Sequence, residues 1–364
     1  MDKFGALPCQ EMKRMMKERN ISGGKEENVN PASLDLSLSE EILRVEGIFL
    51  PHPGEKIDSL IKNIQHSRHD FSYPLEQNVT YLAKLNEELS LPEGVFGFCN
   101  PKSSTGRVDV HVRVLADGVS RYDVIPHGYQ GPLWLIINPK SFPIKISVGE
   151  KLAQLRLFNQ DTSLTEEELK ETMTEKPLIF DSDGLPIGYE RIKIKDGDGS
   201  IILRLDLEQE VVGYECFGSN KVMDFSKRGF YSPDEFFRKI KKEGECIYLK
   251  RGGFYILSTR EAVSVPPDFA CEMAPMDARS GEFRSHYAGF IDPGWGYGKE
   301  GEVNGRPLTL EVRPFEDMVV RHKQAIAKIK YERMSEIPEV LYDVVSTSNY
   351  TSQSKAKLSK HFTE

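Results

Sequence analysis

The chain has 364 residues, of which 39% are hydrophobic and 10% aromatic. This length exceeds the roughly 100 to 200 residues of a typical domain, and the composition can fill substantial cores, which excludes a single small module and a disordered chain. The longest apolar run, Leu133 to Ile137, falls far short of the roughly 20 residues of a membrane helix, so no membrane span is expected. Lys and Arg number 48 against 56 Asp and Glu, and the net charge of −8 disfavours nucleic acid as a partner.

The first twenty residues and the cysteines indicate the compartment. Residues 1–20 carry basic side chains but no continuous apolar core, so they do not form a secretory signal, and a cytoplasmic location is expected. The cysteines are odd in number and unclustered, which argues against a disulfide framework and against a Cys-x-x-Cys metal site. The His-x-Glu and Pro-Cys-x-x-Cys signature of zinc-dependent deaminases does not occur, so we expect no zinc and no other metal ligands.

Local patterns predict many short strands and few helices. In chain order, a helix is expected over Cys9–Arg19 and another over Ser59–Gln65, and alternating runs predict strands over Lys145–Phe158 and Ile201–Val212. A third helix is expected over Pro233–Lys242, because Ser232 can cap it and Pro233 suits its first position. The Thr- and Glu-rich stretch 161–176 is expected to be a charged linker.

An internal repeat is the strongest organisational signal in the chain. The stretch from Tyr81 to Pro92 returns 174 residues later as Tyr255 to Pro266, with Tyr, Glu, Ser and Pro in register. Further echoes in the same order are Lys102–Arg107 with Arg279–Arg284, both basic-Ser-x-x-x-Arg, and Leu133–Pro139 with Leu308–Pro314. The repeat predicts two tandem copies of one β-rich module.

Ordered motifs in both halves resemble those of one enzyme family. They include Pro101-Lys-Ser-Ser-Thr-Gly-Arg107 and Gly128-Tyr-Gln-Gly131 in the first half, and Gly289-Phe-Ile-Asp-Pro-Gly-Trp295 and Leu310-Glu-Val312 in the second. In these residues the sequence resembles the long, duplicated bacterial 2′-deoxycytidine 5′-triphosphate (dCTP) deaminases of the dCTP deaminase and dUTPase superfamily.

The resemblance implies a fold, a domain division and an assembly. The fold is mainly β, with two tandem dUTPase-like distorted β-barrel (β-clip) domains and few short helices. Residues 1–165 would form the N-terminal domain, 166–185 a linker, and 186–364 the catalytic domain, with a nucleotide-covering tail over 342–364. The family assembles as homo-oligomers, with a trimer favoured and active sites between subunits.

Glu311 is the candidate general base, since deamination requires a base to take a proton from the water that attacks cytosine C4. Strand alternation places it on one face with Thr309 and Arg313, opposite Leu310 and Val312. From the pattern alone, a solvated outward glutamate on an amphipathic strand is the favoured interpretation. The resemblance favours catalysis, because Glu311 matches the water-activating residue of the family motif.

The resemblance assigns further roles around Glu311. Ser280 and Arg284 would position the water and the cytosine, and Arg279 would contact the triphosphate. The backbone carbonyl of Ala288 would accept a hydrogen bond from the cytosine amino group, and Asp292 would bind the sugar 3′-hydroxyl. Taken alone, Asp292 in Asp-Pro-Gly is also an ordinary turn signal, and the basic-Ser-x-x-x-Arg motif is also compatible with a capped surface turn.

The C-terminal tail is basic, against the sign of the whole chain. It is compatible with a disordered terminus, but the resemblance implies a lid over the nucleotide. The predicted substrate contacts in it are Tyr342, Gln353, Lys355, Lys357 and Lys360. Mg²⁺ would accompany the substrate triphosphate, with no ligands predicted in the chain.

The first half of the chain lacks counterparts of the carboxylates Glu311 and Asp292. In the repeat alignment Ile136 occupies the position of Glu311, and Ile125-Pro126 stands where the second half has Ile291-Asp292. An isoleucine cannot accept a proton. We therefore expect the N-terminal copy to be catalytically degenerate, with an assembly role or a residual phosphate or effector site.

Three functions follow from the sequence. The first is hydrolysis of dCTP to dUTP and ammonia without a metal, feeding dUMP and thymidylate synthesis, with dTTP as a candidate inhibitor. The second is a dUTP diphosphatase or a bifunctional deaminase that forms dUMP. The third, non-enzymatic, is a nucleotide-sensing or assembly module.

Overall fold

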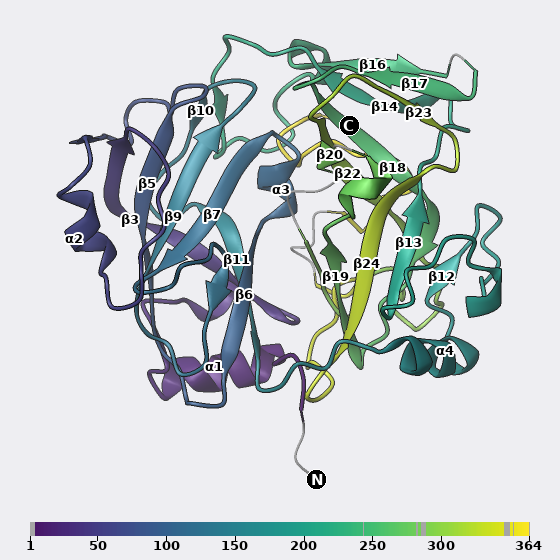
Figure 1. Ribbon diagram of the computed structural model, residues 1–364, viewed down its shortest axis with the longest axis horizontal. Coiled ribbons are helices and arrows are strands. Elements are labelled where there is room, and N and C mark those ends of the chain that lie inside the picture. The colour runs from purple at the N-terminus through teal and green to yellow at the C-terminus, as the bar shows by residue number, and fades with distance from the viewer. Residues whose placement is uncertain are drawn as a thin grey trace. The chain divides into compact units, whose positions relative to one another are not determined.

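The computed structural model describes residues 4–242, 244–281, 283–284, 289–345, 350–351 and 353–363. The chain forms two compact units, both mainly β as predicted (Figure 1). The N-terminal unit comprises Ala6–Gln160, Gly218–Ser232 and Ser359–Glu364, and the C-terminal unit comprises Met1–Gly5, Asp161–Phe217 and Pro233–Leu358. In the described residues, helices are too short or too polar to cross a bilayer.

One large sheet builds the N-terminal unit, in the order β7-β9-β5-β3-β11-β6-β8. The two ends of this path are linked, since the Asp123 N–H beside β8 donates to the Val114 carbonyl of β7 at 2.9 Å. The sheet is therefore barrel-like, as expected for a dUTPase-like fold. The strands of the sheet are β1 Ile21–Ser22, β2 Val29–Asn30, β3 Ser33–Val45, β4 His66–Arg68, β5 Thr80–Ser90, β6 Phe96–Pro101, β7 Val110–Ala116, β8 Val124–Ile125, β9 Gln130–Pro139 and β11 Lys151–Phe158. The strands β10 Ile144–Lys145 and β15 Met223–Asp224 form a separate pair.

The C-terminal unit has two main sheets, β16-β14-β18-β22-β20 and β13-β24-β19-β21, with β17 and β23 as a separate pair. One large apolar cluster, which includes Leu257, Leu310 and Tyr331, forms the core of this unit. Its strands are β12 Ile179–Phe180, β13 Ser200–Arg204, β14 Val211–Cys216, β16 Phe237–Lys241, β17 Cys246–Leu249, β18 Phe254–Val263, β19 Phe269–Ala274, β20 Phe283–Arg284, β21 Phe290–Ile291, β22 Arg306–Pro314, β23 Met318–Arg321 and β24 Ala325–Arg333.

The helices partly match the predictions. Helix α1, Cys9–Lys17, is confirmed, and it buries Cys9, Met12 and Met15 along one face. Helix α2 covers Ile57–Ile61 and so begins and ends earlier than predicted. The short helices α3 and η1 to η4 cover Ser103–Gly106, Glu26–Asn28, Tyr189–Arg191, Pro233–Glu235 and Ala278–Ser280.

The helix predicted over Pro233–Lys242 is wrong beyond its first turn. After η3 the chain forms strand β16, which pairs antiparallel with β14. Phe236 and Phe237 are almost completely buried, and the Phe237 ring lies 6.3 Å from that of Phe254. Strand pairing and aromatic burial, which suit a pleated surface, outweigh the capping signal of Ser232 and Pro233.

The segment expected to be a linker contains helix α4, Glu166–Glu175. The Thr165 hydroxyl accepts the Glu168 N–H, and the Glu168 carboxylate accepts the Thr165 N–H, which forms a capping box. Leu169 and Met173 are buried in the core of the C-terminal unit. This part of the segment is therefore integral to the unit.

Two short segments from the second half of the chain fold onto the N-terminal unit. Strand β15 pairs in parallel with β10. The C-terminal residues run beside 229–231, where the Phe230 and Tyr231 N–H groups donate to the His361 carbonyl at 2.9 and 3.1 Å. The N-terminal unit therefore includes the last described residues of the chain.

A buried glutamate occupies the same place in both units. Glu87 on β5 and Glu261 on β18, 174 residues apart, lie where the strand register shifts. The Glu87 carboxylate accepts the Ser37 N–H at 2.9 Å and the Ser37 hydroxyl at 2.8 Å. The Glu261 carboxylate accepts the N–H and Nε–H of Arg204 at 2.7 and 2.6 Å. Each carboxylate thus satisfies backbone donors that the interrupted ladder leaves open.

Glu87→Gln is expected to remove a pH-dependent part of the stability. Burial raises the pKa of Glu87 to about 6, against hydrogen bonds from Ser37 that lower it. Because the folded-state pKa is raised, this group stabilises the fold below the unfolded pKa, and that contribution, about 2 kcal/mol, is lost as the pH rises through 6. A glutamine can accept the Ser37 N–H and donate to the Ser37 hydroxyl. Urea unfolding from pH 4.5 to 7 should show that wild type loses this free energy and the variant does not.

Glu261→Gln is the matched control. Its carboxylate pairs with a guanidinium, so the same substitution should lower the free energy of unfolding by about 1–3 kcal/mol at pH 7. Equal effects of the two substitutions would contradict the different roles of the two carboxylates.

Candidate active site

Glu311 lies in the interior of β22 and is 2% exposed. It pairs with Ile256 of β18, and Ile256 in turn pairs with Tyr214 of β14, so two further strands follow β22 on this side of the sheet. The outward, solvated glutamate that the strand pattern also allowed is therefore excluded. A buried carboxylate costs free energy unless polar or charged groups compensate it.

Polar residues share the face of β22 that carries Glu311. Alternate residues of a strand share a face, so Thr309 and Arg313 lie with Glu311. Leu308, Leu310 and Val312, on the opposite face, belong to the apolar core. The carboxylate therefore faces away from the core of its unit.

Strand β20 adds Arg284 to this face. Arg284 is directly opposite Arg313 in the antiparallel pairing of β20 with β22. Directly opposed residues project to the same side of a sheet. The predicted pair of Glu311 and Arg284 thus lies on one face, where the second guanidinium, Arg313, adds positive charge.

The C-terminal tail lies along the same strand. The Lys357 N–H donates to the Thr309 hydroxyl at 3.2 Å, two residues from Glu311. The Gln353 side-chain amide donates to the Pro307 carbonyl at 2.7 Å, and Gln353 is 4% exposed. Gln353 and Lys357 are thus held against β22, on the face of Thr309 and Glu311.

Asp292 begins a turn that holds Tyr342. Asp292 is buried, and its carbonyl accepts the Trp295 N–H at 3.2 Å, as expected for a turn. The Tyr342 N–H donates to the Pro293 carbonyl at 2.8 Å, and the rings of Tyr342 and Trp295 are 5.2 Å apart. The structure thus brings the predicted residues Asp292 and Tyr342 to one turn.

Ser280 and Arg279 lie in the short helix η4, before β20. Arg279 forms a two-pronged ion pair with Asp277, at 2.9 and 2.7 Å, and its side chain is 90% exposed. The hydrogen bonds from Arg279 lower the pKa of Asp277. In this arrangement the guanidinium predicted to bind the triphosphate is held by a neighbouring carboxylate.

The remaining predicted residues are distributed differently. Lys355 is exposed, and Lys357 is half-buried. Lys360 belongs to the N-terminal unit, not to the unit of Glu311. Ala288 lies outside the described residues.

The matching face of the N-terminal unit is apolar. Ile136 pairs with Leu82 on β5, as Glu311 pairs with Ile256 on β18. Ile136 belongs to a buried cluster with Trp134, which matches Thr309, and with the α2 residues Ile57 and Ile61. In this unit, hydrophobic side chains and a helix fill the place of the carboxylate.

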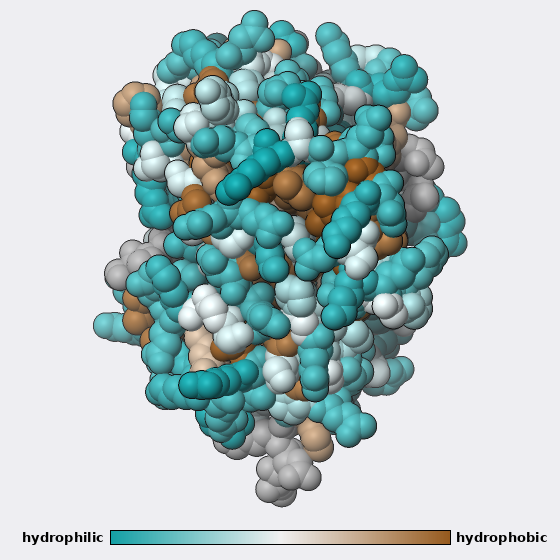
Figure 2. Space-filling model, turned by 90° about the vertical axis from the view of Figure 1, so that its left-hand side faces the viewer, coloured by the Kyte–Doolittle hydropathy of each residue, from teal (hydrophilic) through white to brown (hydrophobic). Residues whose placement is uncertain are grey.

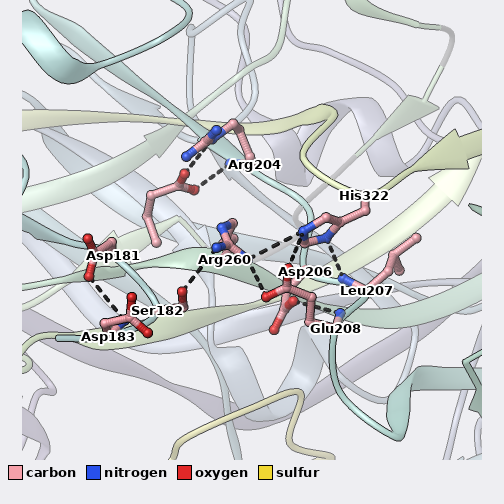
Figure 3. A network of polar contacts seen from close by, with 10 residues as sticks. Asp181, Ser182, Asp183, Arg204, Asp206, Leu207, Glu208, Arg260 and His322 are labelled. Carbon is pink, nitrogen blue, oxygen red and sulfur yellow. Dashed lines mark hydrogen bonds and ion pairs between the residues drawn. The ribbon is translucent and has the colours of Figure 1, made fainter. Parts of the chain in front are cut away.

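A second polar cluster in the C-terminal unit joins three loops (Figure 3). Arg260 donates to Glu208 at 2.6 Å and to Ser182 at 3.0 Å. His322 accepts the Leu207 N–H through Nδ1 at 3.1 Å, and its Nε2 lies 3.0 Å from Glu208 and 3.3 Å from Arg260. Because both ring nitrogens are engaged, we assign this cluster a structural role.

Sequence reasoning missed the pair of Arg306 and Asp343. Their side chains meet at 2.8 Å, and Asp343 also accepts the Gly298 N–H at 3.0 Å. The Arg306 guanidinium lies 4.8 Å from the Trp295 ring. These contacts fix the chain next to Tyr342. No local motif marks the two residues, which are 37 positions apart.

Comparison with known proteins agrees with this fold. A crystal structure of 2′-deoxycytidine 5′-triphosphate deaminase from Agrobacterium tumefaciens matches 93% of this chain and 100% of that chain, with a TM-score of 0.83 and 34% sequence identity. A probable deoxyuridine 5′-triphosphate nucleotidohydrolase of Aeropyrum pernix is 26% identical over 145 residues, 40% of this chain and 84% of that protein. The two units thus have the dUTPase-like fold.

The family is shown by matches over nearly the whole sequence. Residues 3–161 match the N-terminal domain of 2′-deoxycytidine 5′-triphosphate deaminase, and residues 165–362 match its C-terminal domain. The chain belongs to the 2′-deoxycytidine 5′-triphosphate deaminase family, in its long form, and is a hydrolytic deaminase.

Thr309→Val should loosen the tail without changing the shape of the strand residue. The substitution removes the hydroxyl that accepts the Lys357 N–H, at a cost of about 1–3 kcal/mol. Hydrogen exchange in residues 353–358 should then accelerate on the order of fivefold or more. Ser258→Ala is the control, since Ser258 lies opposite Thr309 on the same face. Unchanged exchange in Thr309→Val would show that this bond does not hold the tail.

Proposed function

We propose that the C-terminal unit deaminates dCTP to dUTP and ammonia, with Glu311 as the general base. The observation that carries the proposal is a carboxylate 2% exposed on a strand face that it shares with Arg284 and Arg313. A carboxylate in such surroundings can take a proton from water.

The proposed reaction needs one water and two proton movements. Water adds to C4 of the cytosine ring while Glu311 takes one of its protons. That proton passes to N3 of the ring, and the proton of the new C4 hydroxyl then passes through Glu311 to the amino group. The C4–N bond breaks, a C4 carbonyl forms, and the amino group leaves as ammonia. Arg284 and Ser280 would hold the water and the base. Mg²⁺ would arrive with the triphosphate, whose oxygens are its usual ligands.

The other predicted residues would bind the nucleotide. Asp292 would accept the sugar 3′-hydroxyl, and Tyr342 and Gln353 would contact the substrate from the ordered tail. A tail that closes over the nucleotide would exclude water and strengthen every charge interaction beneath it. For Arg279 to bind phosphate, its ion pair with Asp277 must open.

We further propose a homo-oligomer, with a trimer favoured. Figure 2 shows a patch of hydrophobic side chains on one face, among mainly hydrophilic ones. Contiguous apolar patches of this kind mark association surfaces.

Glu311→Gln should lower dCTP turnover on the order of 10²- to 10⁴-fold with the fold intact, because the amide cannot accept the proton. Release of ammonia from dCTP measures this, and circular dichroism checks folding. Glu316→Gln, the same change at an exposed position five residues further on, is the control and should keep full activity. Residual activity near one half would assign catalysis to the N-terminal unit as well, and full activity would remove Glu311 from the mechanism.

The similarity to a probable dUTP-hydrolysing enzyme supports a second candidate, a bifunctional or diphosphatase activity. Chromatography of the products formed from dCTP and from dUTP separates the possibilities. We expect dUTP and ammonia from dCTP, and no pyrophosphate. Formation of dUMP and pyrophosphate together with ammonia would replace the proposal by the bifunctional reaction.

A further inference from the structure

One ion pair in the C-terminal unit joins three segments next to predicted substrate contacts. Arg306 is the first residue of β22, and its guanidinium donates to the Asp343 carboxylate at 2.8 Å. The second oxygen of this carboxylate accepts the Gly298 N–H at 3.0 Å. Asp343 directly follows Tyr342 in the chain. One carboxylate therefore connects the beginning of β22, the loop after the Asp292 turn, and the segment of Tyr342.

Trp295, in the turn that begins at Asp292, packs against the same ion pair. The Arg306 guanidinium lies 4.8 Å from the centre of the Trp295 ring, a distance typical of a cation over an aromatic face. The Trp295 Nε1–H donates to the Arg306 carbonyl at 3.4 Å. The rings of Trp295 and Tyr342 are 5.2 Å apart. The ring of Tyr342 therefore packs against a side chain that Arg306 holds in place.

The backbone of the Asp292 turn touches the segment of Tyr342 directly. Gly294 has a φ of +93°, and a Cβ added there would lie 2.6 Å from the Leu341 Cβ and 2.8 Å from the Tyr342 nitrogen. The Tyr342 N–H donates to the Pro293 carbonyl at 2.8 Å. Because closely packed segments transmit displacements, a shift of the segment that carries Tyr342 also moves the turn of Asp292.

Stability alone does not require two charges in this place. The side chains of Arg306 and Asp343 are only 12% and 5% exposed. Burial of two ions costs much of what their attraction returns, and apolar side chains of similar volume often stabilise a fold as well or better. The charges add direction instead, because charge-assisted hydrogen bonds fix their partners at defined distances and angles.

We propose that Arg306 and Asp343 are positioning residues for the reaction, which fix the turn of Asp292 where it meets the sugar of the nucleotide. The inference rests on the proposed function, in which Asp292 accepts the 3′-hydroxyl. The pair acts through Trp295 and Tyr342 and does not touch the substrate. Precise placement matters here, because a shift of about 1 Å in a substrate contact can cost on the order of 10²-fold in rate.

Steady-state kinetics with dCTP test the proposal. Asp343→Asn removes the charge and turns an amide NH₂ toward one of the two donors, Arg306 or Gly298, so the turn of Asp292 can shift. KM for dCTP should rise about tenfold and kcat should change less than about threefold, because the weakened contact binds the sugar and not the reacting C4. Arg306→Met should act in the same direction. An unchanged KM in both variants would overturn the proposal.

Glu261→Gln is the matched control, since its carboxylate also meets a guanidinium, at 2.6 Å, and accepts a backbone N–H, at 2.7 Å. Like Asp343→Asn, it should lower the midpoint of thermal unfolding, because each leaves a guanidinium without its carboxylate. Its KM for dCTP should stay within about twofold of the wild-type value. An equal rise of KM in Glu261→Gln would attribute the effect to general loosening of the unit and overturn the proposal.

A nucleotide without the 3′-hydroxyl shows whether the pair acts at the sugar. Calorimetric titration in a Glu311→Gln background measures binding with little turnover. Asp343→Asn should weaken binding of dCTP about tenfold, but binding of 2′,3′-dideoxy-CTP less than about threefold, because the second nucleotide has already lost its contact with Asp292. Equal weakening for both nucleotides would overturn the proposal.

Ammonia release by wild type separates this inference from the proposed function. If wild type binds dCTP but releases no ammonia, the proposed deamination fails, while the titrations with the two nucleotides still decide the role of the ion pair. If wild type releases ammonia and Asp343→Asn shows the wild-type KM and affinity, the inference fails and the proposed function stands. If wild type does not bind dCTP, both fail.

Discussion

The burial of the Glu311 carboxylate is the constraint on which the candidate site depends. Withdrawal of one ionised group from water costs on the order of several kcal/mol, and the fold tolerates it only where charges and hydrogen bonds compensate. The pairing of β20 with β22 places Arg284 opposite Arg313 on the face of Glu311. The tail adds its own backbone to this face through Thr309. Strand register, rather than loop geometry, therefore sets the chemistry of the site.

The two units share the same arrangement of strands but carry different side chains on one matching face. In each unit a central strand carries a buried glutamate at a register shift, and the next strand runs beside it with matching pairs, Leu82 with Ile136 and Ile256 with Glu311. In the N-terminal unit Trp134, Ile136 and α2 close the face with apolar contacts. In the C-terminal unit Thr309 and Glu311 keep it polar. The strand arrangement of each unit includes one such glutamate, Glu87 or Glu261. The matching face of the neighbouring strand, β9 or β22, differs between the units.

Patterns local in sequence were the predictable part. The strand that carries Glu311 and the helix α1 follow from spacing and polarity, because each depends on neighbours only a few residues away. The repeat follows from the same local motifs in the same order in both halves. The strand β16 could not be predicted in this way, since its pairing with β14 and the burial of Phe237 are set by distant residues. Likewise, no pattern showed that Asp277 holds Arg279, or that Asp343 meets Arg306.

Charge distribution explains why the tail is basic in an acidic chain. A chain with a net charge of −8 repels a polyphosphate over most of its surface, so cations must gather where such a ligand binds. Residues 353–357 contribute to the unit of Glu311, whereas residues 359–361 belong to the other unit and bring Lys360 beside Lys102 and Arg228. These three cations are separated by 126 and 132 positions in sequence, so the charge cluster exists only in the folded chain.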